Sequence, residues 1–209
     1  MTINADGYLE HLRSYLKVSS IKGPHYGNLC NGSERKDLEA NEFVLADTDE
    51  ASKERLKVKM SFKGTMLGIR LDACQQPLFH FLDSENTKRS WQKRCGFVVF
   101  QSYRRQLRVS CIEFKKARTN IPAEKIMLQL HSGEAWCKTL HKLLAAYTNE
   151  SREIRLSKYV FTDCISPAPD LDANGRFLKN YPDIRHYLFS DADGLALEDL
   201  DRSCEKIIR

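Results

Sequence analysis

The chain has 209 residues, of which 42% are hydrophobic and 29% are charged, and its formal net charge is +5. This length and apolar content are sufficient to bury the core of one globular domain. No stretch approaches the roughly 18 consecutive apolar residues that span a bilayer, and the first 20 residues lack the pattern of a secretory signal. We therefore expect a cytoplasmic protein that does not enter a membrane.

Two helices are expected near the start of the chain. Apolar residues with helical spacing predict the first helix over Tyr8–Val18. A Gly- and Asn-containing loop follows, and Ser33 is an N-cap residue for a second helix from Glu34 to about Ala46. The segment Lys57–Asp72 alternates in part and predicts one or two strands, and Leu78–Leu82 is a further short strand candidate.

The clearest element is a β-hairpin. Phe97–Tyr103 (FVVFQSY) and Leu107–Lys115 (LRVSCIEFK) are rich in β-branched and aromatic residues, and the segment 104–106 joins them. Opposite charges end its second strand, where Glu113 and Lys115 are two residues apart and so share one face. This pair is either a reaction centre or an exposed ion pair.

A long helix and a strand follow the hairpin. Pro122 and Glu124 suit a first helical turn after Asn120, and an apolar stripe continues it at the spacing of a helix face (Ile126, Leu130, Cys137, Leu140 and Leu144). Arg155–Thr162 is the next strand, and Tyr187–Ser190 is expected to add an edge strand. The order strand, strand, helix, strand predicts an α/β sheet whose last crossover is covered by the helix.

The cysteines and histidines argue against disulfides and a zinc site. Seven cysteines lie scattered between Cys30 and Cys204, and none forms a C-x-x-C pair. This number and spacing are typical of a reducing compartment. The six histidines are also dispersed. A structural zinc site is therefore not expected.

Positive charge is concentrated around the hairpin. Between residues 88 and 118 there are ten Lys or Arg residues and one acid, Glu113, so this segment carries +9 and the rest of the chain sums to −4. A basic surface binds polyanions because each neutralised phosphate releases a condensed counterion. We expect nucleic acid, more specifically DNA, as the partner. The candidate contacts are Lys88, Arg89, Lys93, Arg94, Arg104, Arg105, Lys116 and Arg118.

The segment KRCGFVVFQSYRRQLRVSCIEFKKARTN, with the helix and strand that follow, resembles the core of the PD-(D/E)xK nuclease superfamily. The resemblance covers roughly residues 93–162. Glu113 and Lys115 match the E-x-K positions, and Gln129 lies where relatives carry a glutamine on the following helix. The resemblance implies a restriction-endonuclease-like α/β fold, with a mixed central sheet flanked by helices, and hydrolysis of phosphodiester bonds in DNA. It also implies Mg²⁺ or Mn²⁺, with Glu113 as a metal ligand and Lys115 beside the attacking water and the phosphate.

One position departs from this pattern. If Arg104-Arg105 is a two-residue turn, Tyr103 pairs with Gln106, and position 96 lies opposite Glu113. That residue is Gly96, where the superfamily has a metal-binding Asp. Either another acid replaces it or the domain has lost its metal site. The candidate replacements are Asp83 and Asp72, followed by Glu85, Glu39 and Glu42, each of which is otherwise a residue of a solvated turn or helix face.

Three functions therefore remain open. The first is a Mg²⁺- or Mn²⁺-dependent endonuclease used in restriction, repair or antiphage defence, acting as a homodimer or with a partner protein of a defence complex. The second is a nucleic-acid-binding accessory subunit without activity, which Gly96 favours. The third is a regulatory or immunity module that binds protein. We expect residues 1–162 to form the nuclease-like domain, and residues 163–209, with ten acids against six bases, to be an acidic extension packed on it.

Overall fold

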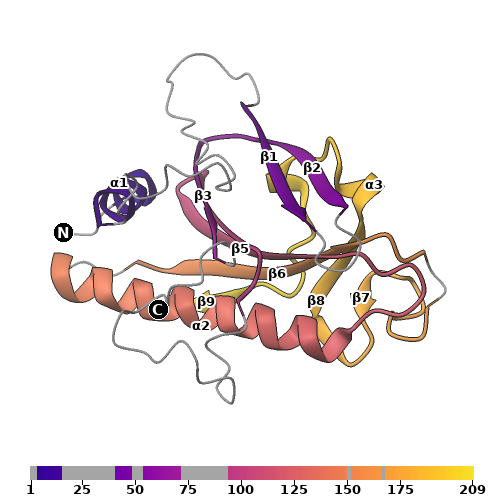
Figure 1. Cartoon of the computed structure of the whole chain (residues 1–209). Helices are drawn as coiled ribbons and strands as arrows, with labels where there is room; N and C mark the ends of the chain where they lie inside the picture. Colours follow the sequence, from indigo (N-terminus) through magenta and orange to yellow (C-terminus); the bar gives the residue numbers. More distant parts are fainter. Residues whose placement is uncertain (1–3, 16–40, 49–53, 72–93, 150–151, 166–167) are drawn as a thin grey trace.

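The structure is a computed structural model and describes residues 4–15, 41–48, 54–71, 94–149, 152–165 and 168–209. Its main feature is a mixed β-sheet with helices packed on it (Figure 1). The predicted α/β class, with a mixed central sheet flanked by helices, is confirmed at this level.

The central sheet contains seven strands within the described residues, in the order β3-β4-β5-β6-β8-β7, with β9 paired to the start of β6. The pairs β5–β6 and β6–β8 are parallel, and the others are antiparallel. The bounds are Thr65–Arg70 (β3), Phe97–Tyr103 (β4), Gln106–Lys115 (β5), Ile154–Thr162 (β6), Phe177–Leu178 (β7), Tyr181–Leu188 (β8) and Lys206–Ile208 (β9).

The hairpin β4–β5 is confirmed, with a turn one residue shorter than the predicted linker. Arg104 and Arg105 form the turn with φ of 49° and 63°, and Gln106 already pairs with Tyr103. Positive φ at both central residues is characteristic of a type I′ turn, whose twist matches that of the strands. The turn therefore fixes the register of the hairpin.

Two helices cover one face of the sheet. Helix α2, Ala123–Thr148, joins β5 to β6 as the predicted crossover, and α1, Ala5–Tyr15, packs on the same apolar core. The hydroxyl of Tyr8 on α1 hydrogen-bonds to Nδ1 of His141 on α2 at 3.0 Å. The predicted first helix is confirmed, with a start three residues earlier than expected.

The opposite face is covered by a two-stranded sheet and by the segment that follows β8. Strands β1 (Asn41–Thr48) and β2 (Arg55–Phe62) form an antiparallel hairpin on the side of the sheet away from α2 (Figure 1). The short helix α3 (Phe189–Ala192) and a 3-10 turn, Leu197–Asp199, contribute buried residues to the same core.

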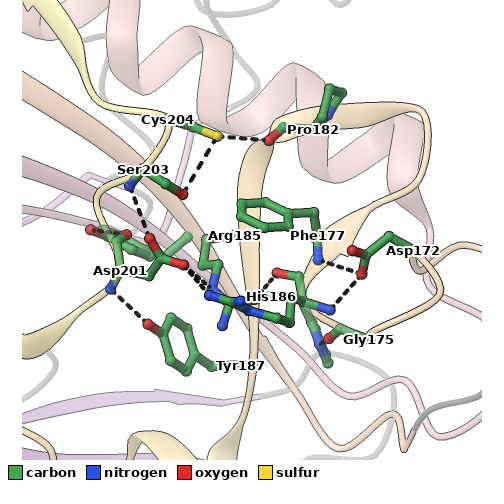
Figure 2. A network of polar contacts seen from close by, with 12 residues as sticks. Asp172, Gly175, Phe177, Pro182, Arg185, His186, Tyr187, Asp201, Ser203 and Cys204 are labelled. Atoms are coloured by element: carbon green, nitrogen blue, oxygen red, sulfur yellow. Dashed lines mark hydrogen bonds and ion pairs between the residues drawn. The ribbon is translucent and has the colours of Figure 1, made fainter.

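A polar network holds the C-terminal segment against the sheet (Figure 2). The guanidinium carbon of Arg185 lies 4.9 Å from the ring centres of both Phe177 and Tyr187. Its Nε is 3.3 Å from Oδ2 of Asp201, which also pairs with Arg176 at 2.6 Å. The backbone N–H of Asp201 also donates to the hydroxyl of Tyr187 at 2.8 Å. Both the main chain and the side chain of Asp201 therefore attach the C-terminal segment to β8.

A buried lysine connects α2 to the centre of the sheet. Lys158 of β6 is 3% exposed, and its Nζ lies 2.6 Å from Oδ2 of Asp183 and 3.2 Å from Oε2 of Glu134 on α2. Lys206 of β9 also contacts Asp183, at 2.9 Å. A buried ammonium needs such partners because its desolvation is costly.

The helix predicted over Glu34–Ala46 is wrong for the part that the structure describes. Residues 41–46 belong to strand β1, and residues 34–40 lie outside the described residues. Phe43 and Leu45 are buried while Val44 is exposed, which is the two-residue period of a strand. Pairing with β2 along the whole strand overrides the helical spacing.

The predicted edge strand Tyr187–Ser190 is also wrong. Strand β8 ends at Leu188, and it is an interior strand between β6 and β7. Ile184 and His186 alternate as its buried residues. Pro182 and the charged neighbours concealed this alternation in the sequence. The strand expected at Leu78–Leu82 lies outside the described residues.

No helix in the described part of the chain is both long enough and apolar enough to cross a membrane.

Asp183 gives the fold a defined acid sensitivity. Burial works to raise its pKa, but hydrogen bonds with Lys158 and Lys206 outweigh burial and lower the pKa from 3.8 to about 2. Because the folded-state pKa is depressed, this contribution to stability is present above about pH 4 and is lost as the pH falls toward 2. We predict that Asp183→Asn lowers the free energy of unfolding at neutral pH and that its deficit narrows between pH 4 and 2.

Urea unfolding followed by circular dichroism at a series of pH values measures this deficit. Asp199→Asn, at an exposed position of the 3-10 turn, is the control. A deficit of Asp183→Asn that stays constant down to pH 2 would contradict the prediction.

Candidate active site

Glu113 and Lys115 project together from the C-terminal end of β5 onto the face covered by α2. Cys111, two residues earlier, lies in the core beneath α1 and α2, whereas Ile112 and Phe114 lie in the opposite core. Glu113 is 2% exposed, and the Lys115 side chain is 21% exposed. The ammonium of Lys115 lies 2.5 Å from Oε1 of Glu113. The predicted side-by-side arrangement on a strand is therefore confirmed.

Gly96 lies opposite Glu113, as the two-residue turn predicts. The last paired residues of the hairpin are Phe97 and Ile112, so the next position joins Gly96 to Glu113. The backbone N–H of Gly96 donates to Oε2 of Glu113 at 2.7 Å, and its carbonyl accepts from the N–H of Leu71 at 3.0 Å. The position that carries an Asp in the resembled superfamily thus supplies a hydrogen-bond donor instead.

A buried threonine lies beside Lys115 on the neighbouring strand and contacts a buried histidine, and no sequence pattern pointed to either residue. Thr162 is the residue paired with Lys115 in the parallel register, and its Oγ1 lies 2.8 Å from Nε2 of His186. Nδ1 of His186 lies 2.9 Å from the carbonyl oxygen of Gly175, so we assign the ring proton to Nδ1 and the Thr162 hydroxyl as donor to Nε2. Burial lowers the pKa of His186, which keeps the ring neutral at neutral pH.

Gln129 reaches the loop before β4 and has no contact with Glu113 among the described interactions. Its Nε2 donates to the carbonyl of Arg94 at 3.2 Å. Its Oε1 is buried without a hydrogen-bond partner among the described residues. Nη1 of Arg94 in turn lies 3.4 Å from the carbonyl of Leu71. Gln129 therefore supports the segment that carries Gly96.

The structure separates the predicted nucleic-acid contacts into two places. One group lies near the Glu113 end of the hairpin and consists of Arg94, Lys116 and Arg118. There Lys116 forms an ion pair with Glu54, and Nε of Arg118 lies 3.6 Å from Oδ2 of Asp163. Arg104 and Arg105 lie at the turn, at the other end of β5. Over eight residues of strand this separation is roughly 27 Å. The remaining predicted contacts lie outside the described residues, namely Lys88, Arg89 and Lys93.

The described residues do not by themselves fit a divalent metal ion. Within the described part, no group of three or more His, Cys, Asp or Glu residues could hold a metal ion. Both carboxylate oxygens of Glu113 face N–H donors, Gly96 and Lys115. Mg²⁺ takes oxygen ligands in near-ideal octahedral geometry, and one carboxylate is a weak site for it. The predicted ligands Asp72 and Asp83 lie outside the described residues.

Three buried cysteines form the support behind Glu113. Cys95 and Cys137 are buried in the same core as Cys111, which precedes Glu113 by two residues on the same strand. Helix α2 approaches this cluster at Gly133, where an added Cβ would lie 2.4 Å from Sγ of Cys95 and 3.4 Å from Sγ of Cys111. The close approach of α2 to the site therefore requires a glycine.

Comparisons of the chain with models of protein families, with curated proteins and with solved structures find no match. The assignment of a function accordingly rests on the residues and their geometry.

We predict that Gly133→Ala destabilises the protein although alanine is the better helix former. Alanine gains about 1 kcal/mol in helix propensity, but overpacking a core costs about 1–3 kcal/mol. In a Cys95→Ala background the closest contact is removed, so the same substitution should cost less or become stabilising. Chemical denaturation of the four proteins measures this coupling.

An equal cost of Gly133→Ala in both backgrounds would show that the thiol of Cys95 does not set the approach of α2. Cys164→Ala, at a buried thiol outside this cluster, is the matched background control.

Proposed function

We propose that this protein is a nuclease with a restriction-endonuclease-like fold that hydrolyses phosphodiester bonds of DNA, and that Glu113 and Lys115 form its reaction centre. The observation that carries the proposal is the contact between a buried carboxylate and a mostly buried ammonium at the end of β5. A buried ion pair is weak evidence of a role in stability, because desolvation offsets the attraction of the two charges, and this leaves room for a chemical role. The crossover from β5 through α2 to a parallel β6 agrees with the resemblance described above.

The chemistry assigns a separate task to each side chain. The ammonium of Lys115 is placed to stabilise negative charge on a phosphate in the transition state. Oxygen ligands such as the carboxylate of Glu113 suit Mg²⁺ or Mn²⁺, which supply Lewis acidity when bound. Since the described residues provide one such carboxylate, this proposal requires a second from Asp72 or Asp83. Asp72 directly follows Leu71, whose N–H bonds to Gly96.

A second candidate function is nucleic-acid binding without cleavage, and Gly96 favours it. In the described structure the N–H of Gly96 satisfies the oxygen of Glu113 that a metal would otherwise use. The pair Glu113–Lys115 is then a retained ion pair beneath a binding surface.

Cleavage assays distinguish the two functions. We predict that the protein cleaves plasmid or linear duplex DNA in Mg²⁺ or Mn²⁺ but not in EDTA. Lys115→Ala should lower the rate by about 10²-fold or more, as expected when one transition-state donor is removed. Lys142→Ala, at an exposed lysine of α2, is the control that should cleave like the parent protein.

Asp72→Asn and Asp83→Asn tested in the same assay identify the second carboxylate, because one of them should abolish cleavage. Circular dichroism of each variant confirms that it folds. A parent protein that binds DNA but cleaves neither substrate with either ion would replace the nuclease proposal with the second candidate. Full activity of Lys115→Ala would remove that residue from the reaction centre.

A further inference from the structure

Two arginines lie next to each other on the face of the central sheet opposite α2. Arg108 of β5 and Arg155 of β6 are paired in the parallel register, so their side chains leave the same face at neighbouring positions. Both are partly exposed. Like charges at directly opposite positions destabilise a sheet. This placement therefore brings two positive charges close together.

A third arginine is added by the C-terminal segment. Arg202 follows Asp201, which the network in Figure 2 fixes to the sheet. Burial and the nearby charge of Arg202 lower the pKa of Arg108. Nη2 of Arg202 donates to the carbonyl of Leu197 at 3.2 Å, but its Nε and Nη1 have no hydrogen-bond partner among the described residues. The largely buried guanidinium of Arg202 thus adds positive charge near Arg108.

Few negative charges balance this cluster. Glu205 lies between two of the arginines, with Oε2 3.2 Å from Nη1 of Arg155 and Oε1 3.8 Å from Nη1 of Arg202. Arg155 also lies 3.4 Å from Oε1 of Glu153. Arg108 forms no ion pair within the described residues. Three guanidinium groups against two carboxylates leave the cluster with an excess of one positive charge.

Neutral groups orient Arg108 instead of a carboxylate. Its Nε and Nη2 donate to Oε1 of Gln106 at 3.2 and 2.9 Å. Its guanidinium carbon lies 5.5 Å from the ring centre of Tyr103, and that of Arg104 lies 5.1 Å from the same ring. A guanidinium held in place by an amide and a ring keeps its full charge for an external anion.

We propose that Arg108 and Arg155, with Arg104 at the adjacent turn and the buried charge of Arg202 nearby, form a binding surface for the phosphate groups of a nucleic-acid backbone. The choice of nucleic acid as partner rests on the proposed function. This surface is separate from the reaction centre, because it lies on the other face of the sheet and roughly 24 Å along β5 from Lys115. It would hold the nucleic acid at a distance from Glu113.

Binding measured in EDTA tests this surface without any cleavage. Fluorescence anisotropy with a labelled duplex and a labelled single strand, over a series of salt concentrations, gives the affinity and its salt slope. We expect Arg108→Gln to bind about tenfold more weakly, as for loss of one charged hydrogen bond, and to reduce the salt slope by about one. Lys142→Gln removes the same charge from the exposed side of α2 and should leave binding unchanged.

Thermal unfolding of the free variants separates binding from structure. Arg108→Gln relieves the repulsion with Arg155, so it should unfold at the same temperature as the parent protein or higher. The proposal would be overturned if Arg108→Gln bound nucleic acid as tightly as the parent protein, or if it unfolded at a lower temperature. It would also be overturned if the parent protein bound inorganic phosphate but not nucleic acid. If the parent protein cleaves no DNA but Arg108→Gln still binds DNA more weakly than the parent, only the nuclease proposal is overturned.

Discussion

The register of the β4–β5 hairpin determines both sites. The two-residue turn at Arg104-Arg105 pairs Tyr103 with Gln106, and this pairing sets every later pair along the strands. It places Glu113 opposite Gly96 on the face of α2, and it places Arg108 on the opposite face. A shift of one residue would exchange the two faces, so that Glu113 would enter the core around Ile112 and Phe114.

Buried charge is placed where the sheet joins other elements. Lys158 links β6 to α2 and β8 through carboxylates, and Asp201 links the C-terminal segment to β8 through Arg185. Every charge in these networks has an opposite partner within hydrogen-bonding or ion-pair distance, which is what a low-dielectric interior requires. Arg108 differs because neutral groups orient it, and this difference is the basis of the proposed binding surface.

Local patterns in the sequence predicted the hairpin, its register, helix α2 and the parallel strand β6. These elements have strong periodicity, and the turn geometry follows from the number of residues between the strands. Strands β1 and β8 were missed because their identity depends on distant partners, β2 in one case and β6 with β7 in the other. Of the site, Glu113, Lys115 and Gly96 were predictable from spacing. Thr162, His186 and Arg202 were not, because only the fold brings them near β5.

Anomalous scattering from a crystal soaked in Mn²⁺ tests the reaction centre most directly. If Glu113 serves the proposed nuclease, a manganese peak should lie about 2–2.5 Å from one of its carboxylate oxygens, with a second carboxylate on the same ion. A soaked crystal in which Glu113 keeps its bonds to Gly96 and Lys115, with no manganese peak beside it, would contradict the proposed metal-dependent activity.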